Sequence, residues 1–310
     1  MTGFTSFFMC ILFRLEPADS CIMDFKNTSI SNVSEYLKWV KDTFTSESEG
    51  ILFEQTKVYY RGQSDIAWEL KPKAFREYKK ESGLTLNESR LLKSASLYLW
   101  NEMSIFHTYL EKLIYFQHYG LGTRLLDVTF NPLIALYMAC AEKKGDEENE
   151  KKDGAVYCGY RIEHDDPVIA EYSAEYLFTT GQAAMDFLDI ESYAQKHNIS
   201  TSLFAASHFI LPPINNPRIE AQNGAFIMPS LVNSDGKDGY MANSNKLDDS
   251  GFFDEKRAVI NKDCKEEILQ ELSLFGINVG TIYKGVADKL QAIQQEEYWR
   301  ISKYKVDPTL

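Results

Sequence analysis

The longest uninterrupted helical pattern in the chain limits how the rest can fold. Residues 87–116 contain neither proline nor glycine, and leucine, tyrosine, phenylalanine and tryptophan recur through them, as in a helix with a buried face. A single helix of this length is uncommon in a globular protein, so we expect a break near Ser104. The pattern ends where Gly120 and Gly122 enter, and Asn131-Pro132 starts the next helix, because asparagine is a good N-cap and proline suits the first helical position.

The other segments alternate between helical and β-prone patterns. Helical spacing is found at 29–45, 133–141, 183–197, 265–275 and 285–300, and β-prone runs are found at 57–61, 125–129, 155–161 and 225–228. The first of these runs ends at Gly62, where we expect the strand to enter a turn. We predict an α+β fold, a single domain over residues 23–300 with a central mixed or antiparallel sheet flanked by helices.

Three segments stand outside this pattern. Residues 4–13 are apolar but too short to cross a bilayer, and no basic residue precedes them, as a signal peptide would require. Residues 1–22 are therefore either an extension upstream of the native start or a short buried element. Residues 231–251 are rich in asparagine, serine, aspartate and glycine, which predicts a long mobile loop, and residues 301–310 form a tail.

Charge and cysteine content argue against several classes of protein. The net charge is −12, and no basic run is longer than residues 71–73, whereas duplex binding needs clustered lysine and arginine. We therefore predict no general nucleic-acid binding, and no membrane association. The 5 cysteines include no CxxC pair, which favours free thiols in the cytoplasm over a disulfide framework or a metal site.

The first candidate site is the sequence Tyr60-Arg61-Gly62-Gln63. An arginine at the end of a strand places a rigid, charged fork at the rim of a sheet, which suits bidentate binding of phosphate or carboxylate. The alternative is a structural pair between Arg61 and a carboxylate of the protein.

The second candidate site lies within residues 117–132, which are dense in residue types that bind and react: His118, Tyr119, Thr123, Arg124, Asp127, Thr129 and Asn131. Histidine is suited to general acid–base catalysis, and on a strand Asp127 and Thr129 share one face. The alternative is that Arg124 pairs with Asp127 in a buried turn while His118 is a core residue.

These two segments resemble a known family. YYRGQSDIAWELKPKAFRE, followed by QHYGLGTRLLDVTFNPLIALYMACAE, resembles the FRG domain, whose Phe-Arg-Gly core stands here as Tyr60-Arg61-Gly62. PRIEAQNGAFIM at residues 217–228 and EEILQELSLFGINVGTIYKGVADKLQ at 266–291 resemble its later blocks. The sequence departs from the family pattern at Tyr60 and at Gly122, where proline is more frequent.

The order of these blocks is similar to that of the ADP-ribosyltransferase superfamily, which implies an ADP-ribosyltransferase-like core. Its sites combine an early arginine, a Ser/Thr strand leading into a helix, and a late acidic or amide residue. The resemblance implies NAD or an ADP-ribose-containing nucleotide as ligand, with ADP-ribosyl transfer or NAD hydrolysis as the reaction. The implied catalytic residues are Arg61, His118 and Glu220, and the implied ligand contacts are Tyr60, Gln63, Tyr119, Thr123, Arg124, Asp127, Thr129, Asn131 and Gln222.

Glu220 and Gln222 are alternatives for the late acidic or amide residue. If Gln222 rather than Glu220 faces the ribose, the carboxylate is missing and transfer would be slow or absent. The chain would then be a non-catalytic sensor that binds a nucleotide or a partner, and FRG-like proteins suggest bacterial stress or phage defence as the setting for either function. A third alternative is an enzyme that acts on nucleic-acid ends, which would need a basic rim around the site.

Overall fold

The computed structural model describes residues 26–47, 56–76, 88–141, 152–162, 167–179, 190–212, 217–234, 240–242, 252–285, 288–294, 296 and 299. Among the helices in these ranges, none is both long enough and apolar enough to cross a membrane.

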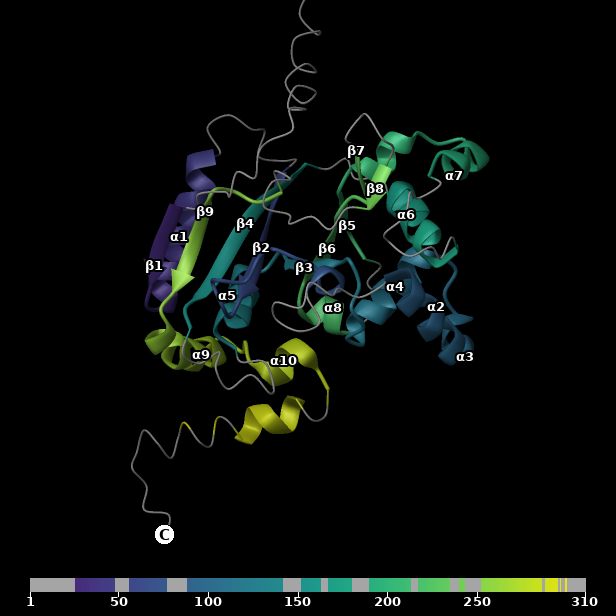
Figure 1. Cartoon of the computed structure of the whole chain (residues 1–310). Coiled ribbons are helices and arrows are strands. Elements are labelled where there is room, and N and C mark those ends of the chain that lie inside the picture. The colour runs from purple at the N-terminus through teal and green to yellow at the C-terminus, as the bar shows by residue number, and fades with distance from the viewer. Residues whose placement is uncertain are drawn as a thin grey trace, which may run out of the picture.

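One mixed sheet of 7 strands organises the molecule, in the order β1-β9-β4-β2-β3-β6-β5 (Figure 1). The strands are β1 (Lys26–Ile30), β2 (Thr56–Gln63), β3 (Leu126–Thr129), β4 (Gly154–Ile162), β5 (His208–Ile210), β6 (Gly224–Met228) and β9 (Lys256–Ile260). β1 is parallel to β9, and all the other neighbouring strands of this sheet are antiparallel. The sheet and its flanking helices form a single-domain arrangement, which confirms the predicted α+β class.

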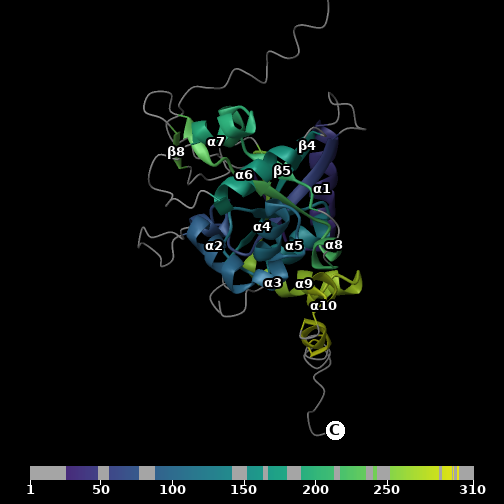
Figure 2. The same cartoon turned by 90° about the vertical axis from the view of Figure 1, so that its right-hand side faces the viewer.

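The helices fall into two groups, which pack near the two ends of this sheet. The first group is α1 (Val33–Glu47), α5 (Pro132–Cys140), α9 (Lys265–Leu274) and α10 (Val279–Tyr283). The second is α2 (Glu88–Tyr98), α3 (Trp100–Met103), α4 (Tyr109–His118), α6 (Pro167–Thr179) and α7 (Ile190–His197), which gather near the β3-β6-β5 end (Figure 2). The short helix α8 (Pro217–Ala221) lies between the two groups (Figure 1).

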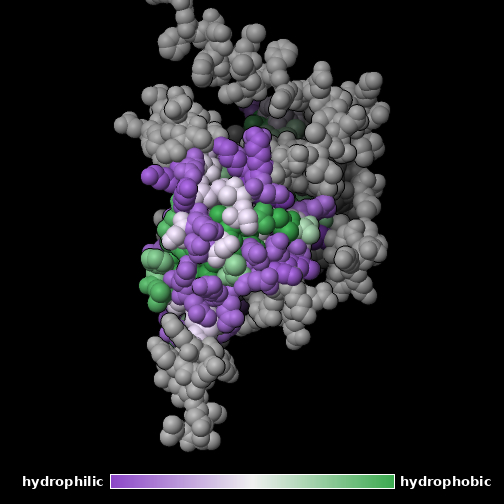
Figure 3. All heavy atoms as spheres, turned by 90° about the vertical axis from the view of Figure 1, so that its left-hand side faces the viewer, coloured by the Kyte–Doolittle hydropathy of each residue, from purple (hydrophilic) through white to green (hydrophobic). Residues whose placement is uncertain are grey.

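Each group of helices has its own hydrophobic core. α1, α5 and α9 bury Tyr36, Leu136 and Leu272 against β4 and β9, whereas α2, α4 and α6 pack around Leu113 and Phe204. A third cluster covers the opposite face of the central strands. On the outer face that carries α1 and β1, hydrophilic residues surround a smaller hydrophobic area (Figure 3).

Helix α5 crosses the sheet where two strands carry glycine. A Cβ at Gly62 of β2 would lie 1.9 Å from the backbone oxygen of Ala135, and one at Gly154 of β4 would lie 2.3 Å from that of Ala139. The expected turn at Gly62 is therefore wrong: β2 continues to Gln63, and the glycine is required because the backbone of α5 approaches the strand so closely.

The break expected near Ser104 is present. α3 ends at Met103 and α4 begins after Thr108, whose hydroxyl accepts from the Glu111 amide at 3.1 Å and forms a capping box with it. The N-cap at Asn131 is also confirmed, since its side chain accepts from the Leu133 amide at 3.0 Å.

Several elements depart from the expected pattern or lie outside it. Residues 231–251 are not one continuous loop, because they include the hairpin β7 (Val232–Ser234) and β8 (Tyr240–Ala242). Of the predicted helix 183–197, residues 190–197 are helical. Residues 1–22, 183–189, 235–239, 243–251 and 301–310 lie outside the described residues, so the expectations placed on them stay untested.

Candidate functional site

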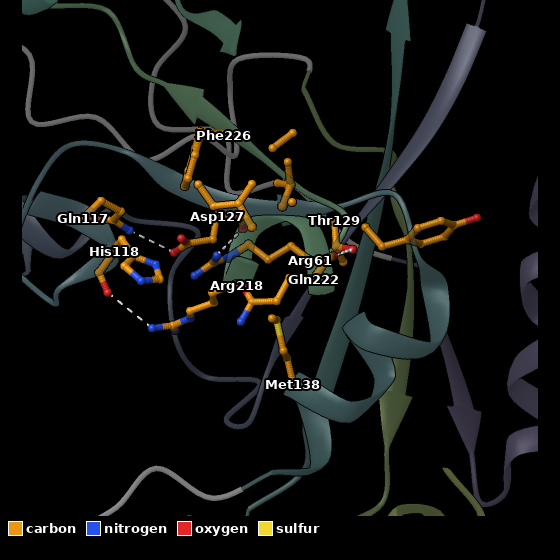
Figure 4. Close-up of a pocket in the computed structure, with 14 residues that line it drawn as sticks. Arg61, Gln117, His118, Asp127, Thr129, Met138, Arg218, Gln222 and Phe226 are labelled. Atoms are coloured by element: carbon orange, nitrogen blue, oxygen red, sulfur yellow. Dashed lines mark hydrogen bonds between the residues drawn. The ribbon is translucent and has the colours of Figure 1, made fainter. Parts of the chain in front are cut away.

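A pocket opens where the central strands meet the end of α4 and the short helix α8 (Figure 4). Its lining combines both candidate segments of the sequence with the later PRIEAQNG block. The lining residues are Tyr60, Arg61, Gln117, His118, Asp127, Val128, Thr129, Met138, Arg218, Ile219, Gln222, Gly224, Ala225 and Phe226. Strand pairing brings these blocks together, because Tyr60 is opposite Thr129 and Asp127 is opposite Phe226.

Arg61 is held rigidly at the floor of this pocket. Its Nη1 donates to the backbone oxygen of Asp127 at 2.6 Å, and its Nε donates to Oε1 of Gln63 at 3.3 Å. Gln63 is buried and is anchored in turn by a bond from its Nε2 to the Trp68 oxygen at 2.9 Å. Desolvation lowers the pKa of Arg61 to about 10, although the nearby Asp127 opposes this effect, so the guanidinium group remains charged at neutral pH.

Asp127 supplies the carboxylate of the pocket. Its Oδ2 accepts from Nε2 of Gln117 at 3.0 Å, and Oε1 of Gln117 accepts from the hydroxyl of Thr123 at 2.7 Å. Thr123 is fully buried and therefore acts by orienting Gln117. Asp127 itself is exposed and shares its face of β3 with Thr129, as the alternation of residues along a strand predicts.

Arg218 of α8 brings a second guanidinium group to the pocket. Its Nη1 donates to the backbone oxygen of His118 at 3.3 Å, and its guanidinium carbon lies 4.7 Å from the ring centroid of Tyr283. Figure 4 shows the side chains of Arg218, Arg61 and His118 converging on the same space. The site therefore gathers positive charge in a protein whose net charge is −12.

The surroundings of His118 favour the neutral form of its imidazole. Desolvation lowers its pKa below the usual value, the nearby Arg218 lowers it further, and Asp127 opposes both. A lowered pKa favours the neutral imidazole, in which one ring nitrogen keeps its hydrogen and the other can accept a hydrogen bond or a proton.

Thr129 and Gln222 form the back of the pocket. The Thr129 hydroxyl donates to the backbone oxygen of Gln222 at 2.6 Å and accepts from the Asn131 amide at 3.0 Å. Both of its hydrogen-bonding functions are thus used within the protein, so it positions the turn after α8. The Gln222 Nε2 is buried and has no hydrogen-bond partner among the described residues, which leaves a donor at the pocket wall.

Several residues expected at the site lie elsewhere. Arg124 is 6% exposed and donates from Nε to Oε2 of Glu88 at 2.8 Å, so the suggested Arg124–Asp127 pair is wrong. Glu220 does not line the pocket: its side chain is 64% exposed and lies 3.9 Å from Nζ of Lys284. Asn131 serves as a helix cap, and Tyr119 is exposed beside the pocket.

Sequence reasoning missed other residues of the site, above all Arg218 and Gln117. Arg218 stands in the PRIEAQNG block two residues before Glu220, and a guanidinium group so close to a candidate acid was the available signal. Arg76 stands near the end of the block that begins with Tyr59 and contains Arg61; it is partly buried, desolvation lowers its pKa against the opposing charge of Asp127, and its Nε donates to the Lys71 oxygen at 3.0 Å. Nothing local to Glu88 in the sequence indicates its pairing with Arg124.

Taken together, the side chains offer donors for an anion and two acceptors. Arg61, Arg218 and Gln222 Nε2 donate, whereas Asp127 and neutral His118 accept. Within the described ranges, no three His, Cys, Asp or Glu side chains gather closely enough to hold a metal ion. The arrangement suits a ligand that carries both an anionic group and hydroxyl groups.

Comparison with known proteins identifies one segment of the chain. Residues 56–148 match the family model of the FRG domain, so an FRG domain is present there and supports the family resemblance over this segment. It contains Arg61, His118 and Asp127 but not Arg218 or Gln222. No curated protein and no solved structure matches the chain.

Proposed function

We propose that the pocket binds the phosphate groups of a nucleotide, and that this nucleotide is NAD or another ADP-ribose-containing ligand. The observation that carries the proposal is the convergence of Arg61, Arg218 and the unpartnered Gln222 amide on one pocket. Guanidinium groups bind phosphate oxygens through paired, charge-assisted hydrogen bonds. A buried amide donor without a partner has a free-energy cost, which a phosphate or sugar oxygen would relieve.

The charge of the pocket supports an anionic ligand. The Asp127 carboxylate stands among the guanidinium groups of Arg61, Arg76 and Arg218 and the neutral ring of His118. The positive groups exceed the negative one, so the pocket attracts anions although the whole chain is acidic.

The acceptors support a ribose beside the phosphate. An inorganic phosphate would satisfy the arginines but would leave the Asp127 carboxylate and the His118 nitrogen facing other acceptors. Ribose hydroxyls can donate to both groups. A ligand with phosphate and ribose in sequence therefore fits the donors and acceptors better than a phosphate alone.

The reaction we propose for this ligand takes place at the nicotinamide ribose. The bond between C1′ and the nicotinamide nitrogen breaks, nicotinamide leaves with the bonding electrons, and the sugar becomes oxocarbenium-like. In this proposal Asp127 supplies the carboxylate that stabilises that positive charge, because Glu220 does not line the pocket. Water or an acceptor then forms the new bond to C1′, and neutral His118 takes the proton that it releases.

A specific observation also favours the second candidate, a sensor that binds the nucleotide without turnover. Gln222 lines the pocket at the late position, whereas Glu220 is exposed beside Lys284. In this alternative the ligand binds through the same arginines, but Asp127 only accepts a ribose hydroxyl.

Incubation of the purified protein with NAD tests both candidates. Nicotinamide release is followed for the wild type, Arg61→Ala, Asp127→Asn and Glu220→Gln, alongside the thermal shift produced by ADP-ribose. Release that is lost in Arg61→Ala and Asp127→Asn but kept in Glu220→Gln supports the enzyme. A thermal shift without release supports the sensor, and the absence of both would refute the proposed ligand.

A further inference from the structure

Aromatic rings connect His118 in the pocket with the exposed Tyr119 and with the half-buried Tyr115 and Phe106. The centroids of Phe106 and Tyr115 are 5.0 Å apart, those of Tyr115 and Tyr119 are 4.6 Å apart, and those of His118 and Tyr119 are 4.9 Å apart. Tyr119 is 70% exposed although it contacts two of these rings. Its ring is therefore supported by the protein and open to solvent.

The backbone fixes Tyr119 in this position. It is the C-cap residue of α4, and its amide donates to the Tyr115 oxygen at 3.1 Å. The following Gly120 adopts a φ of +87°, a conformation that ends the helix at this point, and its backbone oxygen accepts from Nζ of Lys73. A ring held in this way loses little conformational entropy when a ligand packs on it.

Tyr119 differs from the two described aromatic residues that are more exposed. Tyr98 and Trp100 are 90% and 71% exposed, but neither has a ring contact within the described part of the chain, and neither is next to a residue that lines the pocket. Tyr119 directly follows His118, whose ring meets it edge-on at an interplanar angle of 90°. An edge-on contact leaves the faces of one ring available for stacking.

We infer that Tyr119 is the stacking surface for the base of the nucleotide whose phosphate groups occupy the pocket. This inference rests on the proposed function and adds the part of the ligand that the pocket leaves unexplained. Tyr119 stands outside the lining of the pocket and its ring contacts His118, which lines it, so a base stacked there would lie beside the pocket. Stacking of a base on an aromatic side chain tolerates any base, because every base has a π-face.

Two ligands separate base recognition from phosphate recognition. ADP-ribose carries a base, whereas inorganic pyrophosphate carries phosphate groups alone. Their affinities are measured by calorimetry for the wild type, Tyr119→Ala, Tyr119→Phe and Tyr98→Ala, and thermal melting verifies that each variant is folded. Tyr98→Ala is the matched control, because it removes an exposed tyrosine far along the chain from the pocket residues.

We expect Tyr119→Ala to weaken ADP-ribose binding on the order of tenfold and to leave pyrophosphate binding unchanged. Tyr119→Phe and Tyr98→Ala should bind both ligands as the wild type does. ADP-ribose binding that is unchanged in Tyr119→Ala overturns the inference while the proposed function stands, and so does an equal loss for both ligands. If the wild type binds neither ligand, the proposed function fails and the inference fails with it.

Discussion

The guanidinium group of Arg61 donates to the backbone oxygen of Asp127 across neighbouring strands, over 2.6 Å. This bond fixes the orientation of the arginine from β2 against the strand that carries the pocket carboxylate. Because the acceptor is a backbone oxygen, the Asp127 side chain keeps its own oxygens for Gln117 and for a ligand. This hydrogen bond joins the two segments of the sequence that were marked as candidate sites.

Replacement of Arg61 should therefore remove most of the ligand affinity. We expect Arg61→Ala to weaken ADP-ribose binding by about 2 kcal/mol, as for loss of charged hydrogen bonds, which is roughly thirtyfold. Arg61→Lys should restore only part of it, because an ammonium group lacks the bidentate fork. Calorimetric titration measures both, with Arg90→Ala of α2 as the control, and wild-type affinity in Arg61→Ala would exclude Arg61 from the site.

Gly62 should be the least replaceable residue of β2. A Cβ at this position would lie 1.9 Å from the Ala135 oxygen and 2.8 Å from the Ala139 amide nitrogen, so Gly62→Ala must push α5 away from the sheet. We expect a loss of about 3 kcal/mol or more in the free energy of unfolding, measured by urea denaturation. Gly224→Ala is the control, because its nearest neighbour would be 3.6 Å away, and equal stability of the two variants would contradict this reading.

The sequence was sufficient for those features that depend on neighbouring residues. The Asn131 cap, the break near Ser104 and the shared face of Asp127 and Thr129 all follow from local spacing. The same local patterns marked Arg61 and residues 117–132 as candidates, and the pocket contains residues from both.

Features that depend on residues far apart in the sequence could not be predicted from local spacing. The sequence alone suggests a turn at Gly62, because it does not show that the backbone of α5 packs against this glycine. The exposed strand β1 has no clear strand pattern in the sequence, and its pairing with β9 identifies it. The choice between Glu220 and Gln222 depends on how the turn after α8 is tied to Thr129, because two residues are more than half a helical turn apart and so face different sides.

The buried pair of Glu88 and Arg124 should serve stability. The Glu88 carboxylate accepts from the Arg124 amide at 2.7 Å and from its Nε at 2.8 Å, and both side chains are almost completely buried. Glu88→Gln leaves a buried charge without its partner, so we expect a loss of about 3 kcal/mol in unfolding free energy. Glu255→Gln, which removes the exposed partner of Lys26, should leave the urea midpoint nearly unchanged. Similar midpoints for both variants would contradict a structural role for the pair.

The amide of Gln222 should lower the stability of the free protein and strengthen the binding of the ligand. Its Nε2 is buried without a partner in the described part of the chain, and such a donor costs about 1 kcal/mol or more. Gln222→Met, of similar size, should therefore raise the free energy of unfolding by about 1 kcal/mol and weaken ADP-ribose binding. Thermal melting and titration of the same preparation measure the two effects. A variant that is less stable, or that binds as the wild type does, would show that the amide is already satisfied in the free protein.

Ligand binding should be coupled to the protonation of His118. Desolvation and the charge of Arg218 lower its pKa from the ordinary value, against the opposing charge of Asp127, so the protonated form is disfavoured in the free protein. A bound phosphate adds negative charge and raises this pKa, so binding takes up protons and affinity increases as the pH falls through the region just below 6.5. Calorimetry of ADP-ribose binding in buffers of different ionisation enthalpy measures the uptake, because the phosphates of ADP-ribose stay ionised in this range. His118→Gln should abolish the uptake, and uptake that persists in this variant would assign the coupling to another group.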